Sequence, residues 1–212
     1  MNAISKKYEF TNETKQVGDV TLYRIRALRD FGDVKAGDLG GFIEKESNLS
    51  HDGNCWVYDK ARVFQNARVY ENGKVKSFFV DVYGDAQIYG NAIFEGMTIN
   101  DYCEVYGNAH IQNAVVIEGN AKIYDNASVS DNAYISDTSV ICGDAHVGGD
   151  AIVGDGAYIC DHSSVIDDAV VSGYSCIHSN ASLSFGDQIH DEAIPRFGSD
   201  DDYFRDEYED VA

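Results

Sequence analysis

Three cysteines and one histidine of this 212-residue chain are spaced so that they could bind a metal ion. Cys142, Cys160 and His178 follow one another at intervals of 18 residues. Cys176 lies two residues before the histidine. Thiolates and imidazoles are ligands that Zn²⁺ prefers, and layers of a fold stacked every 18 residues would bring these four within about 5–7 Å. Neighbouring strands also splay such side chains apart, so we expect no metal and no other cofactor, with these four as the candidates if a metal binds.

The element that must position these residues is a six-residue repeat. From Ile111 to Ile189, a Val, Ile or Leu recurs at every sixth position, most often with a small residue two positions before it. Asn, Asp or Gly precedes the small residue, and these types tolerate the left-handed backbone of a tight corner. The repeat extends upstream to Val57, with one extra residue after Val75 and one missing residue after Phe94.

A period of six residues does not match a helix face, which repeats near 3.6, so each unit is a short strand followed by a corner. The branched residue points inward and its two neighbours point outward. Three units close a triangular coil of 18 residues, and strands of successive coils pair about 4.8 Å apart. A short period kept over most of a chain indicates a stacked solenoid.

This pattern resembles the hexapeptide-repeat left-handed β-helix family. The resemblance implies a left-handed coil, whereas the general crossover rule would predict a right-handed one. Residues 24–28, 37–43 and 48–50 also look like parts of uncharacterised β-helix proteins of bacteria and their phages. We therefore expect an all-β fold, a single left-handed parallel β-helix with an N-terminal β-hairpin cap and a short acidic C-terminal tail.

The repeat divides the chain into three parts. Residues 1–50 lack it and form the capping region, because an uncapped solenoid would pair its open strand edges with other chains. Residues 51–195 form the β-helix, which ends near Pro195 because proline cannot donate to a further rung. Residues 196–212 form the acidic tail.

The capping region contains a predicted hairpin. Residues 8–10 and 20–28 have the composition of two strands, and the turn-prone residues 12–19 lie between them. Ile43 and Leu49 are six residues apart, and this spacing indicates an irregular first coil.

The triangle has three outer faces, and the one we call the apolar face predicts self-association. Its outward residues are an apolar row with small residues alongside: Val116, Tyr134, Ile152 and Val170, flanked by Ser136, Gly154 and Ser172. Apolar side chains in a row on the outside suggest close packing against a partner. Hexapeptide-repeat proteins commonly form trimers, so we expect a homo-oligomer, a trimer, with the four apolar residues in its interface.

The other two faces carry polar and aromatic columns. The tyrosine face stacks Tyr70, Tyr89, Tyr106, Tyr124, Cys142, Cys160 and His178. The histidine face carries Trp56, Lys74, His110, Ser128, His146, Ser164 and Ser182. A ladder of tyrosines stabilises adjacent strands by itself.

The net charge of −20 is unevenly distributed. Residues 1–50 hold eight basic and eight acidic groups, residues 51–190 carry −13, and residues 191–212 carry −7. Aspartates at corners explain most of the −13, but corner chemistry does not explain the tail. A chain this acidic is not expected to bind nucleic acid directly.

No apolar run approaches the ~18–20 residues of a membrane span, and the N-terminus does not read as a signal peptide. Five irregularly spaced cysteines without an export signal favour reduced thiols in a cytoplasmic protein.

The acidic tail also holds aromatic residues, and we expect it to bind a partner. The residues concerned are Asp200, Asp201, Asp202, Tyr203, Phe204, Asp206, Glu207, Tyr208, Glu209 and Asp210. Its charge would dock on a basic groove of a host protein whose normal ligand is nucleic acid, and its aromatic residues would supply apolar anchors. A solvated tail without a partner is the alternative.

The family resemblance raises one enzymatic alternative. Hexapeptide-repeat acyltransferases use a catalytic histidine beside a loop that projects from the coils, and His110 or His146 would be that histidine here. No repeat unit carries an insertion longer than a residue or two, so nothing encloses a substrate. We therefore expect no catalytic residue and interpret the chain as a non-catalytic acidic binding protein, phage-encoded and antagonising a host protein, with a divergent acyltransferase as the alternative.

Overall fold

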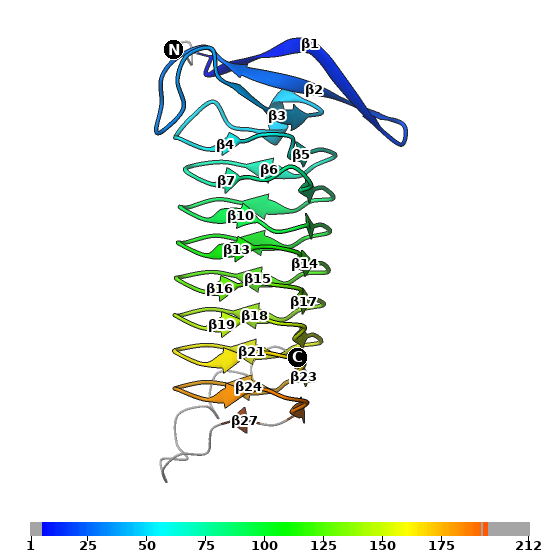
Figure 1. Ribbon diagram of the computed structural model, residues 1–212, viewed down its shortest axis with the longest axis vertical. Coiled ribbons are helices and arrows are strands. Elements are labelled where there is room, and N and C mark those ends of the chain that lie inside the picture. Colours follow the sequence, from blue (N-terminus) through cyan, green and yellow to red (C-terminus); the bar gives the residue numbers. More distant parts are fainter. Residues whose placement is uncertain (1–5, 192, 195–212) are drawn as a thin grey trace, which may run out of the picture.

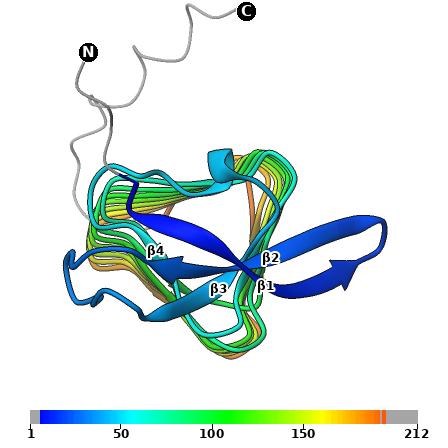
Figure 2. The ribbon, with the colours of Figure 1, turned by 90° about the horizontal axis from the view of Figure 1, so that it is seen from above.

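The computed structural model describes residues 6–191 and the backbone of residues 193 and 194. These residues form one stack of triangular coils with a long hairpin at its N-terminal end (Figure 1). Seen along the axis, the coils superpose as a triangle and the hairpin lies across it (Figure 2). Within the described residues the fold is all-β, apart from one 3₁₀ turn at Glu46–Asn48.

The strands form three sheets, one for each side of the triangle. The apolar face contains β1 (Tyr8–Val17), β2 (Val20–Ala27), β3 (Leu39–Ile43), β5 (Arg62–Val63), β8 (Asp81–Val82), β11 (Thr98–Ile99), β14 (Val116–Ile117), β17 (Tyr134–Ile135), β20 (Ile152–Val153), β23 (Val170–Ser172) and β26 (Gln188–His190). The histidine face contains β4 (Trp56–Val57), β7 (Lys74–Val75), β10 (Ile93–Glu95), β13 (His110–Gln112), β16 (Ser128–Val129), β19 (His146–Val147), β22 (Ser164–Val165) and β25 (Ser182–Leu183). The tyrosine face contains β6 (Arg68–Val69), β9 (Gln87–Ile88), β12 (Glu104–Val105), β15 (Lys122–Ile123), β18 (Val140–Ile141), β21 (Tyr158–Ile159), β24 (Cys176–Ile177) and β27 (Ala193–Ile194).

The register confirms the predicted repeat. Strands of the apolar face pair in parallel one coil apart, as Val116 does with Tyr134 and Tyr134 with Ile152. The two predicted slips lie in the early coils, where paired residues are 19 apart from Arg62 to Asp81 and then 17 apart. From β11 onward the spacing on this face is 18, whereas the last pair on the tyrosine face, Cys176 with Ala193, is 17 residues apart.

Aspartates at the corners join successive coils. Asp125 has a positive φ of 58°, which aspartate adopts more readily than most residues. Its Oδ2 accepts a hydrogen bond of 3.2 Å from the N–H of Gly143, which is 18 residues later in the next coil. Asp131, Asp137, Asp155 and Asp161 make the same bond. Aspartate therefore combines a left-handed backbone with an acceptor for the next coil, and this explains much of the acidic composition of the coils.

The core is a column of branched residues inside the triangle. Ile135 is fully buried and lies in register between Ile117 and Val153 of the neighbouring coils. Ala133 sits two residues earlier, and it is fully buried as well. The predicted inward positions are thus confirmed for the coils that the structure describes.

The hairpin closes the N-terminal end of the stack. β1 and β2 pair antiparallel around Gly18, whose φ is +55°. The turn is much shorter than the residues 12–19 that we expected, because most of that segment extends β1. β2 then pairs antiparallel with β3, and β3 pairs in parallel with β5. The hairpin is therefore continuous with the sheet of the apolar face and covers its edge.

The cap corrects one sequence prediction. We expected Trp56 to point outward on the histidine face, but it is 1% exposed. Its ring contacts Phe31, from the loop after β2, at 5.3 Å between centroids, and Tyr8 of β1 at 6.2 Å. A loop outside the repeat thus covers Trp56, so that an outward position of the repeat becomes part of the core.

Helical segments in the described range are too short and too polar to cross a bilayer.

Candidate functional site

The charge of the coils is concentrated in their C-terminal half. Residues 123–191, which we call the acidic half, contain no lysine and no arginine. They contain eleven carboxylates: Asp125, Asp131, Asp137, Asp144, Asp150, Asp155, Asp161, Asp167, Asp168, Asp187 and Asp191. Sequence analysis noted the acidic coils but missed this division, which can be read directly from where the basic residues stop at Lys122.

Carboxylates of the acidic half are held by the scaffold. Asp144 Oδ1 accepts a hydrogen bond of 2.9 Å from the side chain of Asn126, and Asp150 Oδ1 accepts one of 2.8 Å from Asn132. Hydrogen bonds from the N–H of Gly149 and from the hydroxyl of Ser130 lower the pKa of Asp131 below its ordinary value. These donors fix the side chains and favour the charged form.

Stacked tyrosines on the tyrosine face lead into a cluster of thiols. The rings of Tyr70, Tyr89, Tyr106 and Tyr124 stack with centroid distances of 4.7, 4.8 and 4.9 Å. The next two coils place Cys142 and Cys160 in the same column, as the register of β15, β18 and β21 requires. This confirms the predicted column from Tyr70 to Cys160.

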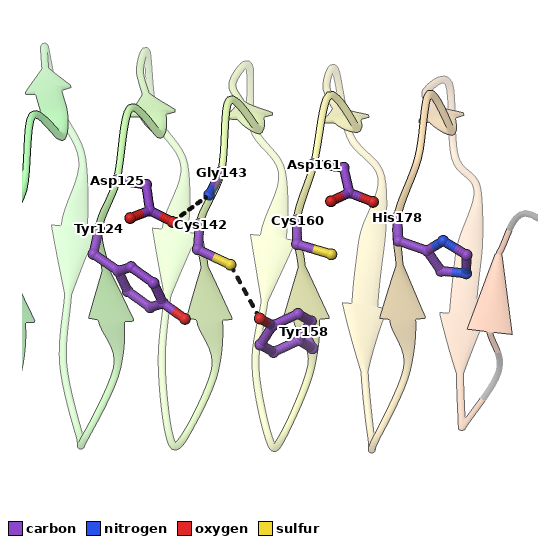
Figure 3. Close-up of a pocket in the computed structure, with 8 residues that line it drawn as sticks. All are labelled: Tyr124, Asp125, Cys142, Gly143, Tyr158, Cys160, Asp161 and His178. Carbon is purple, nitrogen blue, oxygen red and sulfur yellow. Dashed lines mark hydrogen bonds between the residues drawn. The ribbon is translucent and has the colours of Figure 1, made fainter. Parts of the chain in front are cut away.

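An open depression surrounds the two thiols (Figure 3). Its volume is about 420 Å³, within the range of small-ligand pockets. It is lined by Tyr124, Asp125, Cys142, Gly143, Tyr158, Cys160, Asp161 and His178. Cys142 and Cys160 project from neighbouring strands on the same side of the sheet, and the hydroxyl of Tyr158 points toward Cys142.

The two thiols have unequal acidities. Cys142 Sγ lies 3.2 Å from Tyr158 Oη. Hydrogen bonds from Cys160, Tyr158 and Tyr124 lower the pKa of Cys142 to about 6. The same contact raises the pKa of Cys160, and hydrogen bonding to Cys142 together with burial raises the pKa of Tyr158. The contact therefore favours the charged form of Cys142 and the neutral form of Cys160.

The candidate metal ligands are not gathered into one set. Cys176 pairs in register with Tyr158, so it lies in a different column of the same face from Cys160 and His178. Burial raises the pKa of the Cys176 thiol, which disfavours the thiolate that a metal needs. Among residues 6–191, no group of three or more His, Cys, Asp or Glu side chains is placed to hold a metal ion.

The apolar face holds its predicted row in register. Val116, Tyr134, Ile152 and Val170 pair successively, and Ile152 is 43% exposed. The hydroxyl of Tyr134 donates to Glu118, and this bond raises the pKa of Tyr134 to about 12.

Beside this row lies a more buried position than we expected. Ser136, which the sequence placed on the outside, is only 8% exposed. Its hydroxyl donates to Asp137 Oδ2 at 2.8 Å, and this bond holds the Ser136 side chain against the corner.

On the histidine face, the two histidines considered for acyl transfer have different surroundings. His110 Nε2 lies 3.3 Å from Glu95 Oε2 of the preceding coil, and Lys76 approaches the other oxygen of Glu95 at 3.8 Å. His146 lies over Gly148, where a Cβ would be 3.0 Å from His146 Nε2 and 3.0 Å from Ser130 Oγ. His110 and His146 lie on coils of constant length, without a projecting loop beside them.

The sequence analysis missed a basic and aromatic groove near the cap. Lys15, Lys60, Arg62, Phe78 and Phe79 line it, and the two phenylalanines are 56% and 84% exposed. The signal that could have revealed it is the extra residue after Val75, which forces that corner outward. Lys15 comes from the hairpin, so only the folded cap completes the groove.

The predicted partner-binding residues of the tail, from Asp200 to Asp210, lie outside the residues that the structure describes.

Comparison with known proteins gives one informative relative. No family model matches the chain. An uncharacterized acetyltransferase of Escherichia coli, YdcK, is 33% identical over 103 residues, which is 48% of this chain. The chain spans about a quarter of the length of that relative, since the match covers 26% of it. The parallel β-solenoid and this distant relative both fit a hexapeptide-repeat β-helix family.

Proposed function

We propose that this chain is a non-catalytic interaction protein that binds a basic surface of another protein with its acidic half. The observation that carries the proposal is the set of eleven carboxylates between residues 123 and 191, without a lysine or arginine among them. A field of one sign accelerates encounter with a surface of the opposite sign and suppresses binding to like-charged surfaces.

The charge density supports a partner whose normal ligand is nucleic acid. Residues 123–191 make about four coils, which at about 4.8 Å per coil rise roughly 19 Å along the axis. Eleven charges over this length give one charge per roughly 1.7 Å, and double-stranded DNA carries one per about 1.7 Å. A groove built to neutralise DNA would therefore meet a similar axial charge here, and binding would antagonise that groove.

Rigidity adds to this match. Corner carboxylates accept hydrogen bonds from the next coil, as Asp137 does from Asp155 N at 3.2 Å. Binding to charges that are already fixed costs less side-chain entropy than ordering flexible ones.

Two further parts of the chain belong to the proposal. The row on the apolar face would join copies into a homo-oligomer, a trimer, and so multiply the acidic surface. The tail, residues 196–212 with seven acidic and two basic groups, would extend that surface and add the aromatic anchors that dominate binding hot spots.

The test compares three aspartate-to-asparagine changes inside and outside the acidic half. Asp144, Asp150 and Asp168 are exposed, and asparagine fits such corners because Asn91, Asn108 and Asn126 form the same ladder upstream. The matched control changes three exposed aspartates elsewhere: Asp19, Asp52 and Asp59. Both triple variants and the unmodified chain are immobilised and used to capture proteins from a bacterial lysate.

We expect a captured partner that binds the control variant fully and the acidic-half variant several-fold less. It should be released by salt well above the physiological ~0.15 M and by competing double-stranded DNA. Equal capture by both variants, or a partner that DNA does not displace, would refute the proposal.

Acetyl transfer is the second candidate. Two observations favour it. The relative is described as an acetyltransferase, and Glu95 contacts His110, which would orient that histidine as a general base. Calorimetry with acetyl-CoA distinguishes the two: heat of binding that disappears in His110→Ala would support the enzyme, and its absence would support the interaction protein.

A further inference from the structure

We infer that Cys142 and Cys160 are a peroxide-sensitive dithiol that closes to a disulfide between neighbouring coils. The inference concerns two thiols that the proposed interaction does not use, although Asp125 and Asp161 beside them belong to the acidic half. It rests on the placement of the two thiols on adjacent strands, the hydroxyls beside them and the open depression above them (Figure 3).

The spacing of the two strands lies within the range that a disulfide spans. Ile141 pairs with Ile159, so the residues that follow them are also one coil apart in the same column. The N–H of Cys142 donates to the carbonyl of Ile159 at 2.9 Å, which fixes the two strands at this point. Paired parallel strands lie about 4.8 Å apart, and disulfides join Cα atoms about 4.4–6.8 Å apart.

Cys142 is the thiol that attacks. Its sulfur interacts with the Cys160 thiol and with the hydroxyls of Tyr158 and Tyr124, and these contacts lower its pKa. The lowered pKa favours the thiolate, which is the form that reacts with peroxides. Cys160, whose pKa is raised by its contact with Cys142, supplies the second thiol.

The chemistry is a two-electron oxidation by hydrogen peroxide. The Cys142 thiolate attacks one peroxide oxygen, the O–O bond breaks, and hydroxide leaves and is protonated to water. The sulfenic acid that results is attacked by the Cys160 sulfur, which forms the S–S bond and releases the second water. Overall, two thiols and one hydrogen peroxide give one disulfide and two water molecules.

The surroundings select a small, neutral oxidant. Cys142 is 4% exposed and Cys160 is 9% exposed, which favours a small oxidant over one the size of oxidised glutathione. Asp125 and Asp161 line the same depression and repel anions such as oxidised glutathione. Hydrogen peroxide meets both conditions.

Two of the other cysteines provide internal controls. Cys103 is fully buried, and burial raises its pKa to about 12. Cys55 is fully buried beside Lys7, and burial raises its pKa too. Neither should react on the timescale of Cys142.

The experiment treats the reduced full-length chain with hydrogen peroxide and follows its intact mass. Trypsin would leave both thiols in one peptide, because no lysine or arginine lies between Lys122 and Arg196. A protease that cleaves at aspartate cuts at Asp144, Asp150 and Asp155 between them, so a disulfide then links two separate peptides.

We expect the unmodified chain to lose two hydrogen atoms and to yield the cross-linked peptides of Cys142 and Cys160. Cys160→Ser should stop at the sulfenic acid, which dimedone traps on Cys142. Cys142→Ser should form no such product, and Cys103→Ser should behave like the unmodified chain.

A further variant separates a reactive site from two thiols that are merely close. Tyr158→Phe removes the hydroxyl that lies 3.2 Å from the Cys142 sulfur. The pH midpoint for alkylation of Cys142 should rise in this variant relative to the unmodified chain, while the circular dichroism spectrum stays the same. The inference would be overturned if peroxide produced no disulfide between Cys142 and Cys160 in the unmodified chain. It would also be overturned if the disulfide formed as fast in Tyr158→Phe.

Discussion

Ile135 is the residue whose replacement tests the inside of the coil most directly. It is fully buried, and it stacks between Ile117 and Val153 of the coils on either side. Ile135→Ala leaves a cavity that the neighbours cannot fill by moving closer, because hydrogen bonds hold the coils apart. The N–H of Ser136 donates to Val153 O at 2.9 Å, and that of Glu118 donates to Ile135 O at 3.0 Å.

The expected loss follows from the atoms removed. Three methylene equivalents at about 0.8 kcal/mol each give about 2.4 kcal/mol, and the unrelaxed cavity adds to it, so the free energy of unfolding should fall by about 2.5–4 kcal/mol. Ile152→Ala makes the same chemical change at a side chain that is 43% exposed on the apolar face. It should cost about 1 kcal/mol or less.

Urea unfolding measures both changes. Far-UV circular dichroism follows the coils, while the fluorescence of Trp56, the only tryptophan, follows the cap. With a slope of about 2 kcal/mol per molar urea, the midpoint should fall by roughly 1–2 M for Ile135→Ala and by much less for Ile152→Ala. A dilution series separates any effect of self-association.

Equal midpoints for the two variants would refute the reasoning, because they would mean that the two positions have the same surroundings. A cap signal that shifts as much as the coil signal would show one cooperative unit. A shift confined to the coils would show that the stack unfolds in segments, as solenoids can.

Three further predictions concern assembly, corners and pH. Tyr134→Glu with Ile152→Lys should leave circular dichroism unchanged but dissociate the oligomer; an unmodified chain that light scattering finds monomeric at micromolar concentration would contradict this. Gly107→Ala should lower the thermal midpoint by several degrees, because φ is +68° and the new Cβ would lie 2.8 Å from a backbone nitrogen of the next coil; an unchanged midpoint would show that the corner adjusts. The folded-state pKa of Asp131 is lowered, so its stabilising effect is full above its ordinary value of 3.8 and disappears as pH falls through the folded value. Asp131→Asn should therefore lower the urea midpoint at pH 7 but not at the most acidic pH tested; a deficit that persists in acid would contradict the assignment.

The repeat alone determined the coil, the register and the three faces. A solenoid is nearly one-dimensional: each unit contacts the units one coil away, so a period of six residues specifies which residues stack. The row of Val116, Tyr134, Ile152 and Val170 follows from counting, and so does the column that joins the tyrosines to Cys142.

The six-residue spacing does not show how deeply a side chain is buried or which side chains touch across neighbouring columns. The tertiary structure decided both. Ser136 counts as an outward position, yet its hydrogen bond to Asp137 turns it into the corner and leaves it 8% exposed. Trp56 also counts as outward, but a loop outside the repeat covers it. The acidity of Cys142 depends on Tyr158, which lies in a different column of the same face. Rotamers, and segments that fall outside the period, set each of these contacts, so no spacing in the sequence encodes them.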